Sequence, residues 1–236
     1  MRKFLIVAAG LLGLAFYLFL WPTTVSARYR LTLNAEVDGQ PKSGSGVIEI
    51  TRIYNPTGQL LEIENRIRGE AFALDLGEKG KIFALLRPTI LGKDGTGPIN
   101  IIDTVWRDKI DAYPLSENKR RNFAALREAS GTRDVMLDQL PMLVRFRDTN
   151  DPTTMEFLKP QNLEPNFGPG VKMTGATIEI TRDEVTTGIL RHLPWLNGFI
   201  YKWHGKPIDF DLDGHLTSDQ SAHGVRLGSS DFVQGK

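Results

Sequence analysis

The chain has 236 residues, a formal net charge of +1 and no cysteine. The absence of cysteine excludes disulfides, thiol catalysis and cysteine-ligated zinc. The nearly neutral charge gives no electrostatic case for nucleic-acid binding, so we expect no nucleic-acid partner.

The most informative segment is an uninterrupted apolar run over residues 4–20, FLIVAAGLLGLAFYLFL, which follows Arg2 and Lys3. As a helix it would be roughly 25 Å long, close to the ~30 Å hydrocarbon core of a bilayer. Trp21 and Pro22 add an interfacial aromatic residue and a helix stop. Because flanking basic residues stay in the cytoplasm, we expect residues 4–21 to cross the inner membrane once, with the rest in the periplasm.

The same segment also has features of a cleaved signal peptide. Val25, Ser26 and Ala27 offer a match to the small-residue cleavage site of signal peptidase. The apolar run exceeds the usual 7–15 residues of a signal peptide, which favours an uncleaved anchor. Residues 1–27 are therefore predicted to be a membrane anchor or signal segment, and residues 28–236 an exported domain. If the segment is cleaved, that domain is soluble in the periplasm.

Alternating apolar and polar residues predict two strands, over residues 29–37 and 46–54, with turn-forming residues at 38–41. The same pattern continues at residues 60–68, 70–76 and 81–87. Five short strands with turn signals every 8 to 12 residues are typical of an antiparallel meander.

The pattern changes to helical spacing over residues 101–129, where Pro114 divides two predicted helices. Strands are predicted again at residues 141–147, 171–181 and 207–213, with short helical segments at 163–167 and 188–196. We predict one α+β domain, mainly an antiparallel β meander with a few short helices. The pattern leaves open whether residues 130–236 form a separate subdomain.

Four stretches carry a likeness to known sequences: RYRLTLNAEVDGQPKSGSGVIEI at 28–50, RGEAFALDL at 68–76, FALLRP at 83–88 and FGPGVKMTGATIEITRDEVTTGILRHLPWL at 167–196. Together they resemble a family of uncharacterised bacterial envelope proteins with one N-terminal membrane segment and an exported, mostly β domain. The resemblance implies a membrane-anchored envelope protein and supplies no catalytic residues.

The sharpest local motif is DFDLDG at residues 209–214. Asp209, Asp211, Asp213 and Gly214 match the start of a calcium loop, in which a hard cation takes six to eight oxygens and glycine permits a sharp turn. The twelfth position is Gln220 instead of the usual glutamate. The alternative is a strand whose three carboxylates face solvent before a hairpin turn. Calcium is the one cofactor that the sequence suggests.

Signals of catalysis are weak. The run Ser43–Gly46 does not match G-x-S-x-G, and it precedes a strand, which favours a flexible strand entry or a bulge. His192, His204, His215 and His223 have no recognisable spacing to a serine and an acid. An envelope hydrolase with a His and carboxylate site assembled by the fold remains the alternative function.

Aromatic residues are dense in LPWLNGFIYKW at 193–203, which holds Trp195, Phe199, Tyr201 and Trp203. Such density indicates either core packing or a partner-binding patch. The sequence as a whole favours a non-enzymatic binding or scaffolding domain in the cell envelope, with the membrane and an envelope protein as its partners. An open sheet edge would support binding, and a pocket of His, Asp and Ser would support hydrolysis.

Overall fold

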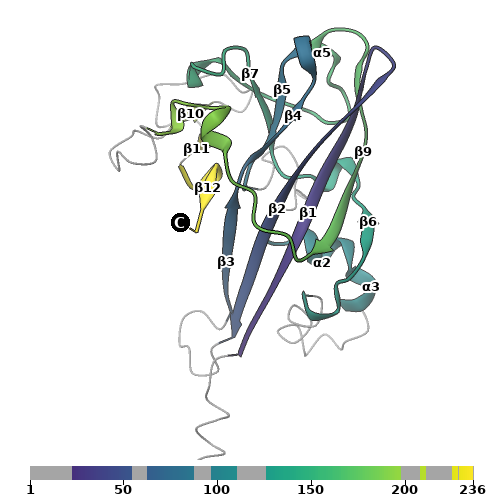
Figure 1. The fold of residues 1–236 in the computed structure, drawn as a ribbon, viewed down its shortest axis with the longest axis vertical. Coiled ribbons are helices and arrows are strands. Elements are labelled where there is room, and N and C mark those ends of the chain that lie inside the picture. Colours follow the sequence, from purple (N-terminus) through teal and green to yellow (C-terminus); the bar gives the residue numbers. More distant parts are fainter. Residues whose placement is uncertain are drawn as a thin grey trace, which may run out of the picture.

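The computed structural model describes residues 23–54, 63–87, 97–110, 126–197, 208–210, 225–227 and 229–235. Two β-sheets pack face to face, with few and short helices (Figure 1). Every pairing between described strands is antiparallel, which confirms the predicted mostly antiparallel β fold.

The larger sheet has six strands and is built around the long β1–β2 hairpin. Its spatial order is β12 (Val233–Gln234), β3 (Ile63–Glu70), β2 (Gln40–Tyr54), β1 (Thr23–Val37), β9 (Val171–Thr181) and β6 (Thr132–Asp134). β9 has the bounds that the sequence predicts, whereas β1 and β2 each have fifteen residues and begin earlier than expected.

The smaller sheet lies across the inner face of the larger one. Its four strands are, in order, β4 (Phe72–Asp75), β5 (Lys81–Ala84), β7 (Leu143–Phe146) and β8 (Met155–Phe157). A separate pair consists of β10 (Ile208–Phe210) and β11 (Val225–Leu227).

The helices connect the strands and cover the ends of the core. The α-helices are α2 (Ile101–Val105), α3 (Arg107–Ile110) and α5 (Glu164–Phe167), and residues 126–128 are also helical. Single 3-10 turns are η1 (Gly77–Lys79), η3 (Leu137–Gln139), η4 (Pro152–Thr154), η5 (Ile189–Arg191) and η6 (Ser229–Asp231). The first of the two helices predicted within 101–129 is present as α2 and α3, and most of the second lies outside the described residues. The helical segment predicted at 163–167 is confirmed as α5, and η5 is much shorter than the helix predicted at 188–196.

The β1–β2 hairpin follows directly from its sequence pattern. Tyr29, Leu31 and Leu33 alternate along β1 and are fully buried in the first core. The turn places Asp38 and Gly39 at φ values of 50° and 79°, the left-handed conformation of both central residues in a type I′ hairpin. The predicted turn at 38–41 is therefore confirmed.

The predicted five-strand meander is wrong, because the chain changes sheets between β3 and β4. β4 packs against the face of β2, where a Cβ on Gly44 would lie 2.6 Å from Leu74 Cα. On Gly46 it would lie 2.4 Å from the Phe72 ring. The run Ser43–Gly46 is therefore strand interior with an unbroken register, not a flexible entry or bulge.

The smaller sheet separates two hydrophobic cores. The first lies between the sheets and contains Leu31, Ile50, Leu74 and Trp106. The second lies on the opposite face of the smaller sheet, where η5 and the chain around η6 cover it; its members include Phe83, Val144, Leu193, Leu196 and Phe232.

The strand pairings also decide the question of a separate C-terminal subdomain. β9 pairs with β1, β7 pairs with β5, and β12 pairs with β3. β6, β7, β8, β9 and β12 thus complete both sheets that residues 23–87 begin, so these described strands do not form a separate subdomain.

The sheet begins earlier than the predicted domain boundary at residue 28. Thr23 to Ala27 already pair with Tyr54 to Ile50, and Ser26 Oγ lies 2.8 Å from Thr51 Oγ1. The proposed anchor over residues 4–21 lies outside the described residues. No helix within the described part of the chain is long and apolar enough to span a bilayer.

Candidate functional site

The start of β1 forms an open sheet edge. β9 pairs with β1 only from Arg28 to Val37, so residues 23–27 have β2 on one side and no described strand on the other. Such an edge presents backbone groups that are free to meet another chain or a ligand.

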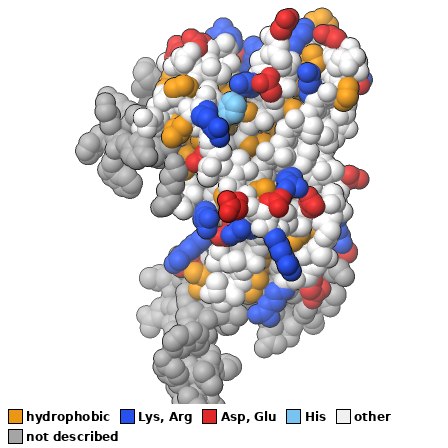
Figure 2. Space-filling view, in the orientation of Figure 1, with side chains coloured by type: hydrophobic (Ala, Val, Ile, Leu, Met, Phe, Trp, Pro, Cys, Tyr) orange, Lys and Arg blue, Asp and Glu red, His pale blue; other side chains and the backbone are white. Residues whose placement is uncertain are grey.

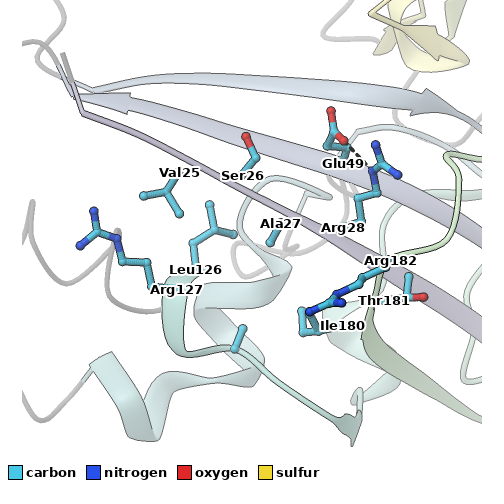
Figure 3. A pocket seen from close by; sticks show the side chains of 11 residues that line it. Val25, Ser26, Ala27, Arg28, Glu49, Leu126, Arg127, Ile180, Thr181 and Arg182 are labelled. Atoms are coloured by element: carbon cyan, nitrogen blue, oxygen red, sulfur yellow. Dashed lines mark hydrogen bonds and ion pairs between the residues drawn. The ribbon is translucent and has the colours of Figure 1, made fainter.

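A hollow of about 530 Å³ lies beside this edge (Figure 3). Its apolar floor joins three parts of the fold: the start of β1, the end of β9 and the helical turn at residues 126–129. The side chains that form the floor are Val25, Ala27, Leu126, Ala129 and Ile180. The hollow exists because β1 continues five residues beyond its pairing with β9, and the turn at 126–129 fills this space only in part.

The rim of the hollow carries three guanidinium groups and one carboxylate. Arg28 donates from Nε to Glu49 at 2.6 Å, and Arg68 lies 3.6 Å from the same carboxylate. Arg127 and Arg182 are exposed, and neither forms an ion pair within the described part of the chain. In Figure 3, Arg127 stands at one end of the hollow, and Arg28 and Arg182 stand at the other. The hollow therefore has a net positive rim.

A segment of residues 182–188, which we name the strap, leaves the end of β9 and crosses the outer face of the sheet (Figure 1). Asp183 forms an ion pair with Arg30, and its carbonyl oxygen accepts from Arg28 at 3.1 Å. Farther along, Thr186 N donates to the Val47 carbonyl at 3.0 Å, and Thr186 Oγ1 accepts from Val47 N at 2.8 Å. The strap thus fixes the end of β9, and Arg182 with it, against β1 and β2.

Acidic and basic side chains are interspersed on this face of the molecule (Figure 2). On the outer side of the sheet they alternate between neighbouring strands, as in the pair of Arg30 and Glu179 at 2.8 Å. Exposed pairs of this kind contribute little free energy, about 0 to 1 kcal/mol each. The arginines without a carboxylate partner are consequently the groups best placed to meet a ligand.

Two buried charges are satisfied within the fold. Arg52 donates to both carboxylate oxygens of Asp103, at 2.7 and 2.6 Å, and also to the Ile99 carbonyl. Glu70 accepts from the backbone N–H groups of Gly188 and Ile189, at 2.5 and 2.9 Å, and so holds the start of η5. Both groups join distant parts of the chain.

Of the four histidines considered as catalytic bases, only His192 lies among the described residues. Its Nδ1 lies 3.2 Å from Lys81 Nζ, and its ring meets the edge of Phe83. Partial burial, followed by the charges of Lys81 and Arg191, lowers the pKa of His192 below its ordinary value. No described serine contacts it, so the described residues do not assemble a Ser–His–acid site here. His204, His215 and His223 lie outside the described residues.

The predicted calcium loop falls largely outside the described residues. The backbone of Asp209 lies in β10, where it is the register partner of Arg226, but its side chain, Asp211 and Asp213 are not described. Among the described side chains, no three His, Asp or Glu residues come together as a metal-binding group. The calcium site remains a prediction, which a higher melting temperature in millimolar calcium than in EDTA would support.

The aromatic segment at 193–203 is described only as far as residue 197. Trp195 packs on Phe146 and Phe232, with ring centroids 5.6 Å apart in both cases. This end of the segment covers the second core, as the core interpretation predicts. Phe199, Tyr201 and Trp203 lie outside the described residues.

The hollow was not predicted, although the sequence carries a signal for it. The alternation of buried residues in β1 continues backward from Tyr29 through Ala27 to Val25. The same residues 25–27 also match a signal-peptidase cleavage site, so their sequence fits two interpretations. The arginines of the rim come from three separate segments, which only the fold brings together.

Comparison of the chain with protein-family models, with curated proteins and with solved structures finds no match. The resemblance to a family of bacterial envelope proteins stays a prediction.

Proposed function

We propose that this protein is a membrane-tethered binding domain of the bacterial cell envelope. Residues 4–21 hold it in the inner membrane by a single span, and the domain that begins at Thr23 lies in the periplasm. It acts by binding a ligand or an envelope partner, without catalysing a reaction.

The observation that carries this proposal is the hollow beside the open start of β1. An open sheet edge next to an apolar hollow is a feature of binding surfaces. Among the described residues, the lining of the hollow has no histidine, and its titratable side chains are three arginines and one glutamate, which do not form a general base paired with a nucleophile.

The start of β1 also supports retention of the N-terminal segment. Cleavage after Ala27 would remove the five residues 23–27, which pair with β2. Two of them, Val25 and Ala27, also pack against the first core. It would also remove part of the floor of the hollow. A retained segment keeps the sheet and the hollow complete.

The test is to purify the full chain with a C-terminal tag from native membranes in mild detergent. We expect the inner-membrane fraction to contain a chain with the intact mass of 26.4 kDa plus the tag. Protease should digest the domain only after the outer membrane is opened. A soluble chain that begins at Arg28 would contradict the tether.

The same preparation tests binding, because mass spectrometry identifies what accompanies the protein. A partner or ligand retained in stoichiometric amount supports a binding role. A chain that retains nothing, but hydrolyses envelope substrates in a manner that His192→Gln abolishes, would instead support the hydrolase alternative.

A further inference from the structure

The hollow lies close to the point where the chain would leave the membrane. Four residues separate Leu20, the last of the apolar run, from Val25 in the floor of the hollow, so Val25 is five residue steps further along the chain. Five residues of extended chain span at most about 18 Å. The headgroup layer of a bilayer is itself about 5 to 8 Å deep on each side of the hydrocarbon core. A tethered domain therefore carries this hollow at, or just above, the lipid headgroups; this step rests on the proposed function.

The arginine side chains of the rim favour an anionic ligand. Arg127 and Arg182 are exposed and have no ion-pair partner within the described residues, whereas Arg28 is held by Glu49. A guanidinium group presents a planar fork of N–H donors that matches the oxygens of a phosphate. The two groups stand at opposite ends of the hollow, so an anionic group at either end meets a guanidinium group.

The apolar floor of the hollow favours a ligand that has an apolar part as well as an anionic group. Val25, Leu126 and Ile180 present branched aliphatic side chains between the arginines (Figure 3). A free phosphate ion would leave this apolar surface in water, whereas the first methylene groups of an acyl chain would cover it. The volume of about 530 Å³ is within the range of small-molecule sites, about 300 to 1,000 Å³.

We propose that this hollow binds the headgroup of an anionic phospholipid from the membrane leaflet next to the domain. Arg182 contacts the phosphate, Arg127 adds positive charge at the opposite end of the hollow, and the apolar floor between them contacts the upper part of an acyl chain. Arg28, fixed by Glu49, and the strap, fixed by Asp183 and Thr186, keep the Arg182 end of the hollow in position. Binding would set the orientation of the domain on the membrane surface.

The test uses the full chain in uncharged detergent micelles, titrated with dioleoylphosphatidylglycerol while the melting temperature is recorded. A ligand that binds only the folded state raises the melting temperature, so the titration gives an apparent affinity. Each arginine near an anionic lipid surface contributes about fivefold in affinity, so Arg127→Gln with Arg182→Gln should weaken binding about 30-fold. Both side chains are exposed, so the double variant should melt like the parent without lipid.

The matched control is Arg147→Gln, which removes an exposed arginine, paired with Glu156, outside the hollow. It should bind the lipid as the parent does. Weakening of about fivefold in the control, the effect expected for the loss of any one arginine near an anionic surface, would mean that only overall charge matters, and would overturn the proposal.

Two further arms identify the source of the anion. Dioleoylphosphatidylcholine should raise the melting temperature much less than phosphatidylglycerol, and inorganic phosphate at the same concentration should have no effect. An equal effect of inorganic phosphate would assign the hollow to a free anion and overturn the lipid proposal. This result is distinct from failure of the tether, which is recorded by the mass and fractionation of the native chain.

Discussion

Individual buried charges connect parts of this fold that are far apart in the sequence. Arg52 lies on β2 with its side chain 2% exposed, and its partner Asp103 comes from α2. A buried guanidinium group is tolerated only when its donors are satisfied, because its desolvation costs several kcal/mol. The Arg52–Asp103 pair therefore attaches α2 to the larger sheet.

The sequence alone does not predict this pair. Alternation in β2 indicates Ile48 and Ile50 as buried residues, and the next inward position is Arg52, where the apolar pattern fails. A charged residue at that position suggests an error in the strand prediction unless its partner is known. The partner lies 51 residues away, and local pattern cannot reveal it.

Replacing Asp103 with alanine should destabilise the protein by about 3 kcal/mol, because it leaves a buried guanidinium without its carboxylate. The estimate is at the lower end of the range for buried pairs, since the Asp103 side chain is 19% exposed. Denaturant unfolding of the full chain in detergent, followed by tryptophan fluorescence, measures the change.

The control for this experiment is Glu64→Ala, which removes the carboxylate of an exposed pair with Arg66 on β3. Exposed pairs contribute little, so its midpoint should stay at that of the parent. If Asp103→Ala unfolds at the same denaturant concentration as this control, then the buried pair does not stabilise the fold.

Whole elements were predicted better than the way they pack. β9 matches its predicted bounds because glycine and proline precede it and apolar residues alternate along it, apart from one register shift between Met173 and Gly175. The division of the first five strands between two sheets was missed. Alternation reports that a strand has one buried face, but it does not report which sheet the strand joins.

Two glycines of β2 are the sequence signal for the contact between the two sheets. Because β4 approaches β2 closely at Gly44 and Gly46, these positions cannot hold a side chain. Within a strand, glycine often marks a close approach of another backbone. The sequence suggested flexibility there, whereas the structure shows a contact between the two sheets.

Gly44→Ala should therefore destabilise the protein by about 1 to 3 kcal/mol, the usual effect of overpacking. The new Cβ would lie 2.6 Å from Leu74 Cα and 2.7 Å from the Ala73 carbonyl oxygen, so backbone would have to move. Gly175→Ala in β9 is the matched control, because a Cβ there meets nothing within 4 Å. Equal melting temperatures of the two variants would show that the sheets do not touch at Gly44.

At the scale of the whole molecule, segments that are far apart in the sequence together form the second core and the hollow. The second core joins Phe83 on β5 to Leu193, Leu196 and Phe232. The open end of β1 and the turn at 126–129 likewise form the hollow from segments about a hundred residues apart. Contacts of such long sequence separation define both the fold and the candidate site, and for that reason the sequence predicts strands more readily than it predicts the site.

Removal of residues 23–27 should lower the free energy of unfolding of the domain. A chain of residues 28–236 loses the pairing of Thr23 to Ala27 with β2 and the packing of two partly buried apolar side chains. At about 1 kcal/mol for each side chain, the loss is about 2 kcal/mol, or a melting temperature roughly 4 to 8 °C lower.

The comparison is with a chain of residues 23–236, which keeps the complete strand. Thermal unfolding of both truncated chains under the same conditions measures the difference. If both melt at the same temperature, residues 23–27 contribute nothing to the fold, and a mature protein that starts at Arg28 would be fully stable.

The position of β1 has a mechanical consequence for a tethered protein. A pull on the N-terminal segment acts along β1, which lies between β2 and β9 in the interior of the larger sheet. Antiparallel ladder hydrogen bonds are perpendicular to the strands, so such a load shears many of them at once and does not break them one by one. The hairpin turn at Asp38 lies at the far end of this strand, roughly 50 Å away. The load therefore acts on the hydrogen bonds along β1 before it reaches the turn. A tether through residues 4–21 would thus pull on a strand whose hydrogen bonds resist the load together.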